Sequence, residues 1–159
     1  MSNVMYAGRG KKMTLKELLI KHEGKRYKPY LCSKGKWTIG IGHNIDAKGL
    51  PHDMQSYLTQ YGRITDVMID ILYEQDVNEA IEDCLRLYSN FKGFSKGRKK
   101  ALIDFLFNMG FSRARKFIKA NKAINEGRWE DAGYEMKDSL WYHQVGDRAD
   151  EVIEMLVNG

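Results

Sequence analysis

The chain has 159 residues, 43% of them hydrophobic, which is enough to bury one sizeable core and too little for two independent domains. A formal charge of +5 favours contact with polyanions such as nucleic acid, anionic lipid or bacterial cell wall. Two cysteines exclude a disulfide-dense scaffold, and no apolar run has the length of a secretory signal or a membrane span, so we expect a protein made soluble in a cytoplasm, with reduced thiols and no stable membrane insertion.

The first predicted helix covers Met13 to His22, where leucines recur at helical spacing behind Thr14, a residue type that commonly caps helices. Gly24 is suited to the position just after a helix. Glu23 is therefore expected where a helix ends and the chain turns.

A short antiparallel hairpin is predicted next. Tyr27 to Leu31 and Lys36 to Ile45 are rich in Tyr, Trp, Thr and Ile, and the sequence Cys-Ser-Lys-Gly at 32–35 separates them as a glycine turn. The segment from Asp46 to Ile64 shows no sustained period, so we expect a loop with at most one short helix or strand.

Helices are predicted for the rest of the chain. A long amphipathic helix runs from Thr65 to about Tyr88. Its inward side chains are expected to be Leu72, Val77, Ile81, Cys84, Leu85 and Tyr88. Ser95 can cap a helix ending at Gly110, and two or three more helical stretches follow to Val157. The inward residues of the capped helix are expected to be Ala101, Leu102, Phe105, Leu106 and Met109.

This order predicts a mainly helical α+β protein, with a small β-hairpin lobe and a helical lobe joined by a long helix and a cleft between them. The first helix and β lobe occupy 13–64, the connecting helix 65–88 and the helical lobe 89–159, within one domain over 1–159. The basic residues are scattered, without the motifs of a nucleic-acid binder.

Glu23, Cys32 and Thr38 are the candidate chemical groups. A partly shielded Glu23 could act as a general acid, or it could be a solvated residue at a helix end. Cys32 could be a small buried hydrophobe, a thiolate base, a group that positions water, or a nucleophile paired with His43. Thr38 is an ordinary strand residue whose hydroxyl could orient a water molecule.

Neither a metal nor a cofactor is indicated. The sequence HEGKR lacks the second histidine of an HExxH helix, and the four histidines show no ligand spacing. Gly40-Ile41-Gly42 lacks the third glycine of a nucleotide-binding fingerprint. These glycines are better explained by a tight turn or by close approach of the backbone to another group.

The segment EGKRYKPYLCSKGKWTIGIGH resembles the catalytic signature of the T4-type phage lysozymes, glycoside hydrolase family 24. That signature is Glu, eight residues, Asp or Cys, five residues and Thr, and Glu23, Cys32 and Thr38 fit it without a gap. Further matches follow in order: IT at 64–65, YEQDV at 73–77, ALIDFLFNMG at 101–110, GRWEDA at 127–132, and WYHQ with DRA at 141–149. The resemblance covers about Leu15 to the C-terminus.

The resemblance implies hydrolysis of the β-1,4 bond between N-acetylmuramic acid and N-acetylglucosamine in peptidoglycan. Glu23 would protonate the glycosidic oxygen, Thr38 would help to place the attacking water, and Cys32 would occupy the second catalytic position. An inverting course is suggested. The positions matching substrate contacts are Asn44, Phe107, Asn108, Ala120 and Glu135. Arg148 matches an arginine that pairs with the acid, and His43 and Asp76 match a structural salt bridge across the lobes.

Partners and location are also implied. The resemblance implies a monomer that binds peptidoglycan and depends on a holin, a protein that opens the membrane, to reach the cell wall from the host cytoplasm. The family's better-known members carry aspartate where this chain has Cys32. A thiol with a reference pKa near 8.5 is mostly neutral at pH 7, and the lysines and arginine around it could favour the thiolate.

Two other functions stay open. With Cys32 as nucleophile and His43 as base, the chain would be a cell-wall thiol peptidase or amidase. A lysozyme-like fold that holds glycan without cutting it would be a binding module. New reducing sugar ends indicate the muramidase, new free amines indicate the peptidase, and retention without loss of turbidity indicates the binding module.

Overall fold

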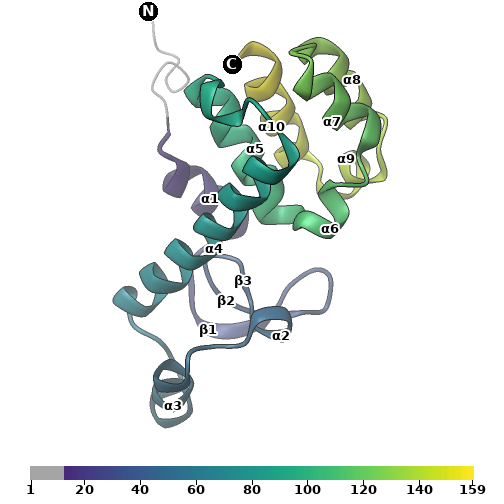
Figure 1. The fold of residues 1–159 in the computed structure, drawn as a ribbon. Helices are drawn as coiled ribbons and strands as arrows, with labels where there is room; N and C mark the ends of the chain where they lie inside the picture. Colours follow the sequence, from purple (N-terminus) through teal and green to yellow (C-terminus); the bar gives the residue numbers. More distant parts are fainter. Residues whose placement is uncertain (1–12) are drawn as a thin grey trace, which may run out of the picture. The chain divides into compact units, whose positions relative to one another are not determined.

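A computed structural model describes residues 13–159, which form two compact units (Figure 1). The N-terminal unit extends to Tyr73 and the C-terminal unit covers Glu74–Gly159. The basic run Gly10 to Lys12 lies outside the described residues. Helices dominate, and the strands form one small antiparallel sheet, so the predicted mainly helical α+β class is confirmed.

Helix α1 (Leu15–Glu23) opens the N-terminal unit with the predicted caps. The Thr14 side chain accepts a hydrogen bond from the Glu17 amide while the Glu17 carboxylate accepts one from the Thr14 amide, a reciprocal pair that satisfies two N-terminal donors. Gly24, with φ +81°, ends the helix in a conformation that glycine favours. Glu23 is therefore the last helical residue, as predicted.

The sheet has three strands in the order β1 (Arg26–Leu31), β2 (Trp37–Gly40), β3 (His43–Asn44). The prediction of one continuous strand from Lys36 to Ile45 is wrong. Gly40, the last residue of β2, and Gly42 both have φ +65°, outside the extended range, so β2 ends at Gly40 and the chain turns back to pair antiparallel as β3. The glycines thus make the tight turn expected of them.

The prediction of a loop with at most one short element over 46–64 is also wrong, because two helices lie there. Helix α2 (Ile45–Lys48) is capped by the Asn44 side chain, which accepts from the Ala47 amide at 3.0 Å. Helix α3 (His52–Tyr61) starts after Pro51 and ends at Gly62, which is left-handed. Figure 1 shows α2 beside β2 and β3.

Helix α4 (Asp66–Leu87) confirms the predicted long helix, and the boundary between the two units falls inside it. Its first turn is capped by Thr65, whose hydroxyl accepts from the Met68 amide at 3.2 Å. The predicted inward residues are buried or half-buried with one exception. Leu85 is 41% exposed, so its assignment to the inward face is wrong.

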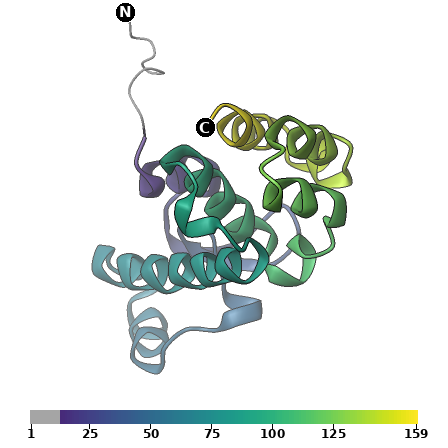
Figure 2. The same cartoon turned by 45° about the horizontal axis from the view of Figure 1, so that its top comes forward.

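The C-terminal unit is entirely helical in its regular structure, as predicted (Figure 2). Its elements after α4 are the 3-10 helix η2 (Phe91–Gly93), α5 (Lys96–Met109), α6 (Phe111–Ala114), α7 (Ile118–Asn125), α8 (Trp129–Lys137), α9 (Leu140–Val145) and α10 (Asp147–Asn158). Five helices follow α5, where two or three were predicted, because short turns divide them. Of the residues expected inward on α5, Met109 is only half-buried.

Packing in this unit joins elements distant in sequence. Helix α10 packs against α5 and α8, and α7 packs against α8. Arg98 fastens α5 to the end of α10, since its guanidinium donates to the carbonyls of Leu156 and Val157 at 2.8 and 2.9 Å. No helix among residues 13–159 is long and apolar enough to cross a bilayer.

Candidate active site

Glu23 lies at the end of α1, half-buried and pressed by the backbone of Gly42. A Cβ added to Gly42 would lie 2.7 Å from the Glu23 Oε1 atom, which is closer than real Cβ contacts come. Only glycine allows this approach, and Gly42 also needs its positive φ. The turn after β2 therefore holds one side of the Glu23 carboxyl group.

Cys32 follows β1 at the start of the hairpin turn, where two backbone hydrogen bonds fix it. Its amide donates to the Lys36 carbonyl at 2.9 Å, and its carbonyl accepts from the Gly35 amide at 2.8 Å. Gly35 supplies the left-handed residue of this turn with φ +74°. The half-buried thiol is free and faces the backbone N–H groups of Lys34 and Lys36.

These surroundings favour the thiolate. Burial by itself would raise the pKa of the Cys32 thiol, but hydrogen bonds from the Lys36 and Lys34 amides, the Thr38 hydroxyl and the Lys34 charge together lower the pKa below its ordinary value. The sequence predicted that nearby cationic side chains would do this. Backbone donors have the larger part, because they point directly at the sulfur.

Thr38 is buried in β2 and joins the same group of contacts. Its hydroxyl donates to the Lys36 carbonyl at 2.9 Å, and by turning it can instead donate to the Cys32 thiolate. The Lys36 carbonyl therefore accepts from both Cys32 and Thr38, and the two side chains share one polar cradle. We use the name sulfur cradle for Cys32, Thr38 and the backbone of Lys34 and Lys36.

Tyr30 is a site residue that the sequence reasoning missed. It stands opposite Thr38 in the β1–β2 register, and the Arg26 guanidinium lies 4.4 Å from its ring centre. Burial raises the pKa of the Tyr30 hydroxyl, the Glu23 and Cys32 charges raise it further, and Arg26 lowers it. Tyr30 is thus within electrostatic range of both Glu23 and Cys32. Alternation along β1 from Cys32 was the signal that could have identified it.

His43 and Asn44 serve local structure on β3. The His43 ring is buried, and its Nε2 atom lies 2.8 Å from the Gly49 carbonyl, which can only accept, so Nε2 carries a proton and is no base. The Asn44 oxygen is engaged in capping α2.

The other predicted residues belong to the C-terminal unit. The Asn108 oxygen accepts from the Trp141 indole at 2.9 Å, and Phe107, Asn108 and Glu135 are half-buried. Arg148 donates through Nε to Asp104 at 2.9 Å, and Asp104 is 0% exposed. Asp76 is buried on α4.

Ala120 does not fit its predicted contact with substrate. It is 2% exposed on α7, where its methyl group packs inside the C-terminal unit and presents no surface to a saccharide. The prediction for Ala120 is withdrawn for this reason.

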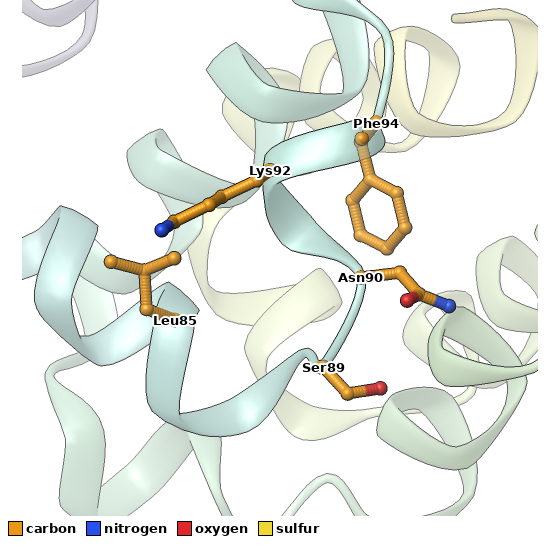
Figure 3. A pocket seen from close by; sticks show the side chains of 6 residues that line it. Leu85, Ser89, Asn90, Lys92 and Phe94 are labelled. Atoms are coloured by element: carbon orange, nitrogen blue, oxygen red, sulfur yellow. The ribbon is translucent and has the colours of Figure 1, made fainter.

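Within residues 13–159, no three His, Cys, Asp or Glu side chains are grouped in a way that could hold a metal ion. A surface hollow of about 560 Å³ lies in the C-terminal unit (Figure 3). Its lining residues are Leu85, Ser89, Asn90, Lys92, Gly93 and Phe94. The lining contains no carboxyl or thiol group, so it offers no acid–base pair, and none of the candidate site residues lies there.

This chain is similar in sequence to known lysozymes. The model of the family described as phage lysozyme matches residues 20–158. The probable T4-type lysozyme 1 of Dictyostelium discoideum is 30% identical over 161 residues, covering 92% of this chain and 95% of the relative.

Two phage proteins are also similar. The pre-baseplate central spike protein Gp5 of Enterobacteria phage T4 is 30% identical over 92% of this chain and 28% of its own length. The SAR-endolysin of Haemophilus phage HP1 is 28% identical over 58% of this chain and 44% of its own length. The chain therefore belongs to the phage lysozyme family and is a peptidoglycan hydrolase of the lysozyme (muramidase) class.

Proposed function

We propose that this lysozyme cleaves the β-1,4 bond between N-acetylmuramic acid and N-acetylglucosamine, with Glu23 as general acid and Cys32 and Thr38 acting on the attacking water. The observation that carries the proposal is the sulfur cradle, which favours a thiolate at the fixed sequence spacing from Glu23.

In the proposed reaction each transferred proton has a named donor and a named acceptor. Glu23 gives its proton to the glycosidic oxygen as the bond from that oxygen to the sugar's anomeric carbon breaks. Water attacks the same carbon from the opposite face, and the Cys32 thiolate takes the proton that the water loses. Thr38 orients the water, and its hydroxyl can turn between the Lys36 carbonyl and the sulfur as the sulfur gains a proton. The product has inverted stereochemistry.

The remaining roles are proposed on the family resemblance. Asn44, Phe107, Asn108 and Glu135 would contact the saccharide. Because the Asn108 oxygen accepts from Trp141, the amide NH2 of Asn108 is the group offered to substrate.

The supporting residues are assigned on the same basis. Arg148 would pair with the acid, while Asp104 anchors its guanidinium from the other side. His43 and Asp76 would form a structural salt bridge.

Product analysis on purified peptidoglycan tests the proposal. We expect wild type to release new reducing sugar ends, Glu23→Gln to release none, Cys32→Ala to be strongly impaired and Cys32→Asp to keep substantial activity. If Glu23→Gln digests peptidoglycan normally, the proposed mechanism is wrong. New free amines would instead indicate the thiol peptidase or amidase.

We also propose that the enzyme is a monomer that lyses bacteria after a holin opens the membrane. Expression in a bacterial host with and without a holin tests the holin requirement, because turbidity should fall only when both proteins are made. Lysis by the enzyme alone would contradict the holin requirement.

A further inference from the structure

An exposed apolar pair lies at the turn end of the β1–β2 hairpin. Leu31 and Trp37 are cross-strand partners, 56% and 46% exposed. Cross-strand partners point to the same face of a sheet, so the two side chains form one apolar surface. Tyr30 and Thr38, the next pair, point to the opposite face, which separates this surface from the sulfur cradle.

Positive charge surrounds this pair. Residues 24–45 contain five basic residues and no acidic one. Of these, Lys34 and Lys36 have exposed side chains within the turn, while Lys25 pairs with Asp66 at 3.1 Å. The Asp46 carboxylate, which accepts from the Trp37 amide at 2.8 Å, adds one negative charge beside Lys34 and Lys36. The turn therefore keeps a net positive charge.

We propose that this hairpin tip, Leu31–Trp37, docks reversibly on an anionic lipid surface. Trp37 and Leu31 would enter the boundary between headgroups and acyl chains, and the lysines would lie against the lipid phosphates. Indole rings favour this boundary, and basic residues are attracted by anionic headgroups.

The shape of the tip favours a surface over a groove-bound ligand. Residues 33–37 are all exposed, and nothing lies within 4 Å of a Cβ built on Gly35, so the tip projects into solvent. Sites for small ligands are concave. A soluble polyanion would satisfy the lysines but would leave the Leu31–Trp37 pair in water. The proposal does not depend on the hydrolytic mechanism.

Vesicle binding by the whole chain tests it. We expect tighter binding to phosphatidylcholine vesicles that contain phosphatidylglycerol than to vesicles of phosphatidylcholine alone, with binding weakened by salt. Lys34→Gln with Lys36→Gln should weaken binding about 25-fold, roughly fivefold per charge. Leu31→Ser with Trp37→Ser should weaken it about tenfold or more.

A matched control removes apolar surface elsewhere. Tyr134 and Leu140, 69% and 72% exposed, lie in the C-terminal unit, and Tyr134→Ser with Leu140→Ser should bind vesicles as wild type does. Circular dichroism shows whether each variant is folded.

Brominated acyl chains give a readout that needs no disruptive change. They should quench Trp fluorescence of wild type, and the quenching should disappear in Trp37→Phe, which keeps the half-buried Trp129 and the buried Trp141.

Four results would overturn the proposal. They are equal binding to neutral and anionic vesicles, equal loss in the control variant, bromine quenching that persists in Trp37→Phe, and a Trp37 requirement for retention on purified glycan with none on vesicles. The vesicles contain no peptidoglycan, so these results leave the proposed hydrolysis untouched.

Discussion

In each unit one glycine lies so close to a neighbouring side chain that a Cβ atom would not fit. The two glycines differ in the chemical group that they approach. A Cβ on Gly42 would meet the Glu23 carboxyl group at 2.7 Å, whereas a Cβ on Gly133 would meet a Val157 methyl group at 2.6 Å. The first close approach constrains a titratable group, and the second packs α8 against α10.

The two cysteines repeat this contrast. In the N-terminal unit, backbone donors lower the pKa of the Cys32 thiol, against the effect of burial. In the C-terminal unit, burial first and the Asp83 charge second raise the pKa of the Cys84 thiol, which is fully enclosed on α4. The same residue type therefore has a lowered pKa in one place and a raised pKa in the other, because backbone donors face the Cys32 thiol and burial dominates at Cys84.

Alkylation should show the largest difference. We expect iodoacetamide to modify Cys32 at least about 10³-fold faster than Cys84 in the native protein, because Cys84 must wait for an opening of the fold. The rate at Cys32, measured in Cys84→Ala, should rise with pH around a midpoint below that of a free thiol, since a lowered pKa yields thiolate at lower pH. Equal alkylation rates for Cys32 and Cys84, or a midpoint for Cys32 above that of a free thiol, would show that the two thiols do not differ in this way.

Asp104 fits the contrast between the two units least well, because it is a carboxyl group buried inside the helical C-terminal unit. Asp104→Ala leaves the Arg148 guanidinium without this partner and should lower the free energy of unfolding by about 3–5 kcal/mol in urea denaturation. Asp131→Ala, which breaks a pair with Arg128 on the surface, should change it too little to resolve. Similar small effects for both would mean that Asp104 is not a structural charge.

Substitution of the two glycines compares the units directly. Gly42→Ala should lower the rate of hydrolysis roughly 10²-fold by displacing Glu23, and should cost about 1–3 kcal/mol of stability because φ is positive. Gly133→Ala should cost stability through the clash with Val157 while leaving hydrolysis by the folded enzyme unchanged. If Gly133→Ala loses activity at a temperature where it is fully folded, then Gly133 does not serve packing alone.

Removing each thiol should give the smallest changes in stability. Cys84→Ala opens a small cavity in the core and should destabilise the protein by about 1–2 kcal/mol, whereas Cys32→Ala should cost less than about 0.5 kcal/mol. Thermal melts of both variants, beside their rates of hydrolysis, check this. A larger loss of stability in Cys32→Ala would mean that the sulfur cradle is mainly structural.

Features set by local chemistry were predictable from the sequence. Thr14 and Gly24 delimit α1 because caps depend on neighbouring residues, and the length of α4 follows from a sustained apolar period. Helices α2 and α3 were missed because their boundary residues, Asn44 and Gly62, also signal loops, and a four-residue helix is too short to show a period.

The sequence spacing of the candidate site residues was predictable, but their arrangement in three dimensions was not. The order of Glu23, Cys32 and Thr38 is visible in the sequence, and their catalytic roles stay predictions. The donors around the sulfur are backbone amides, and their directions depend on the dihedral angles of the turn at Gly35. The contact between Gly42 and Glu23 joins residues from different elements, which no local pattern encodes.

The chain leaves the sheet at β3 and returns to it at Ile64, whose amide donates to the Tyr27 carbonyl of β1 at 3.0 Å. The segment between these points, which contains α2 and α3, therefore starts and ends at backbone that is hydrogen-bonded to the sheet. Insertions or deletions around α3 can be absorbed without shifting Glu23, Cys32 or Thr38, because long surface excursions cost little extra closure entropy. Evolution, or an engineer exchanging this segment between relatives, can vary its length independently of the chemistry.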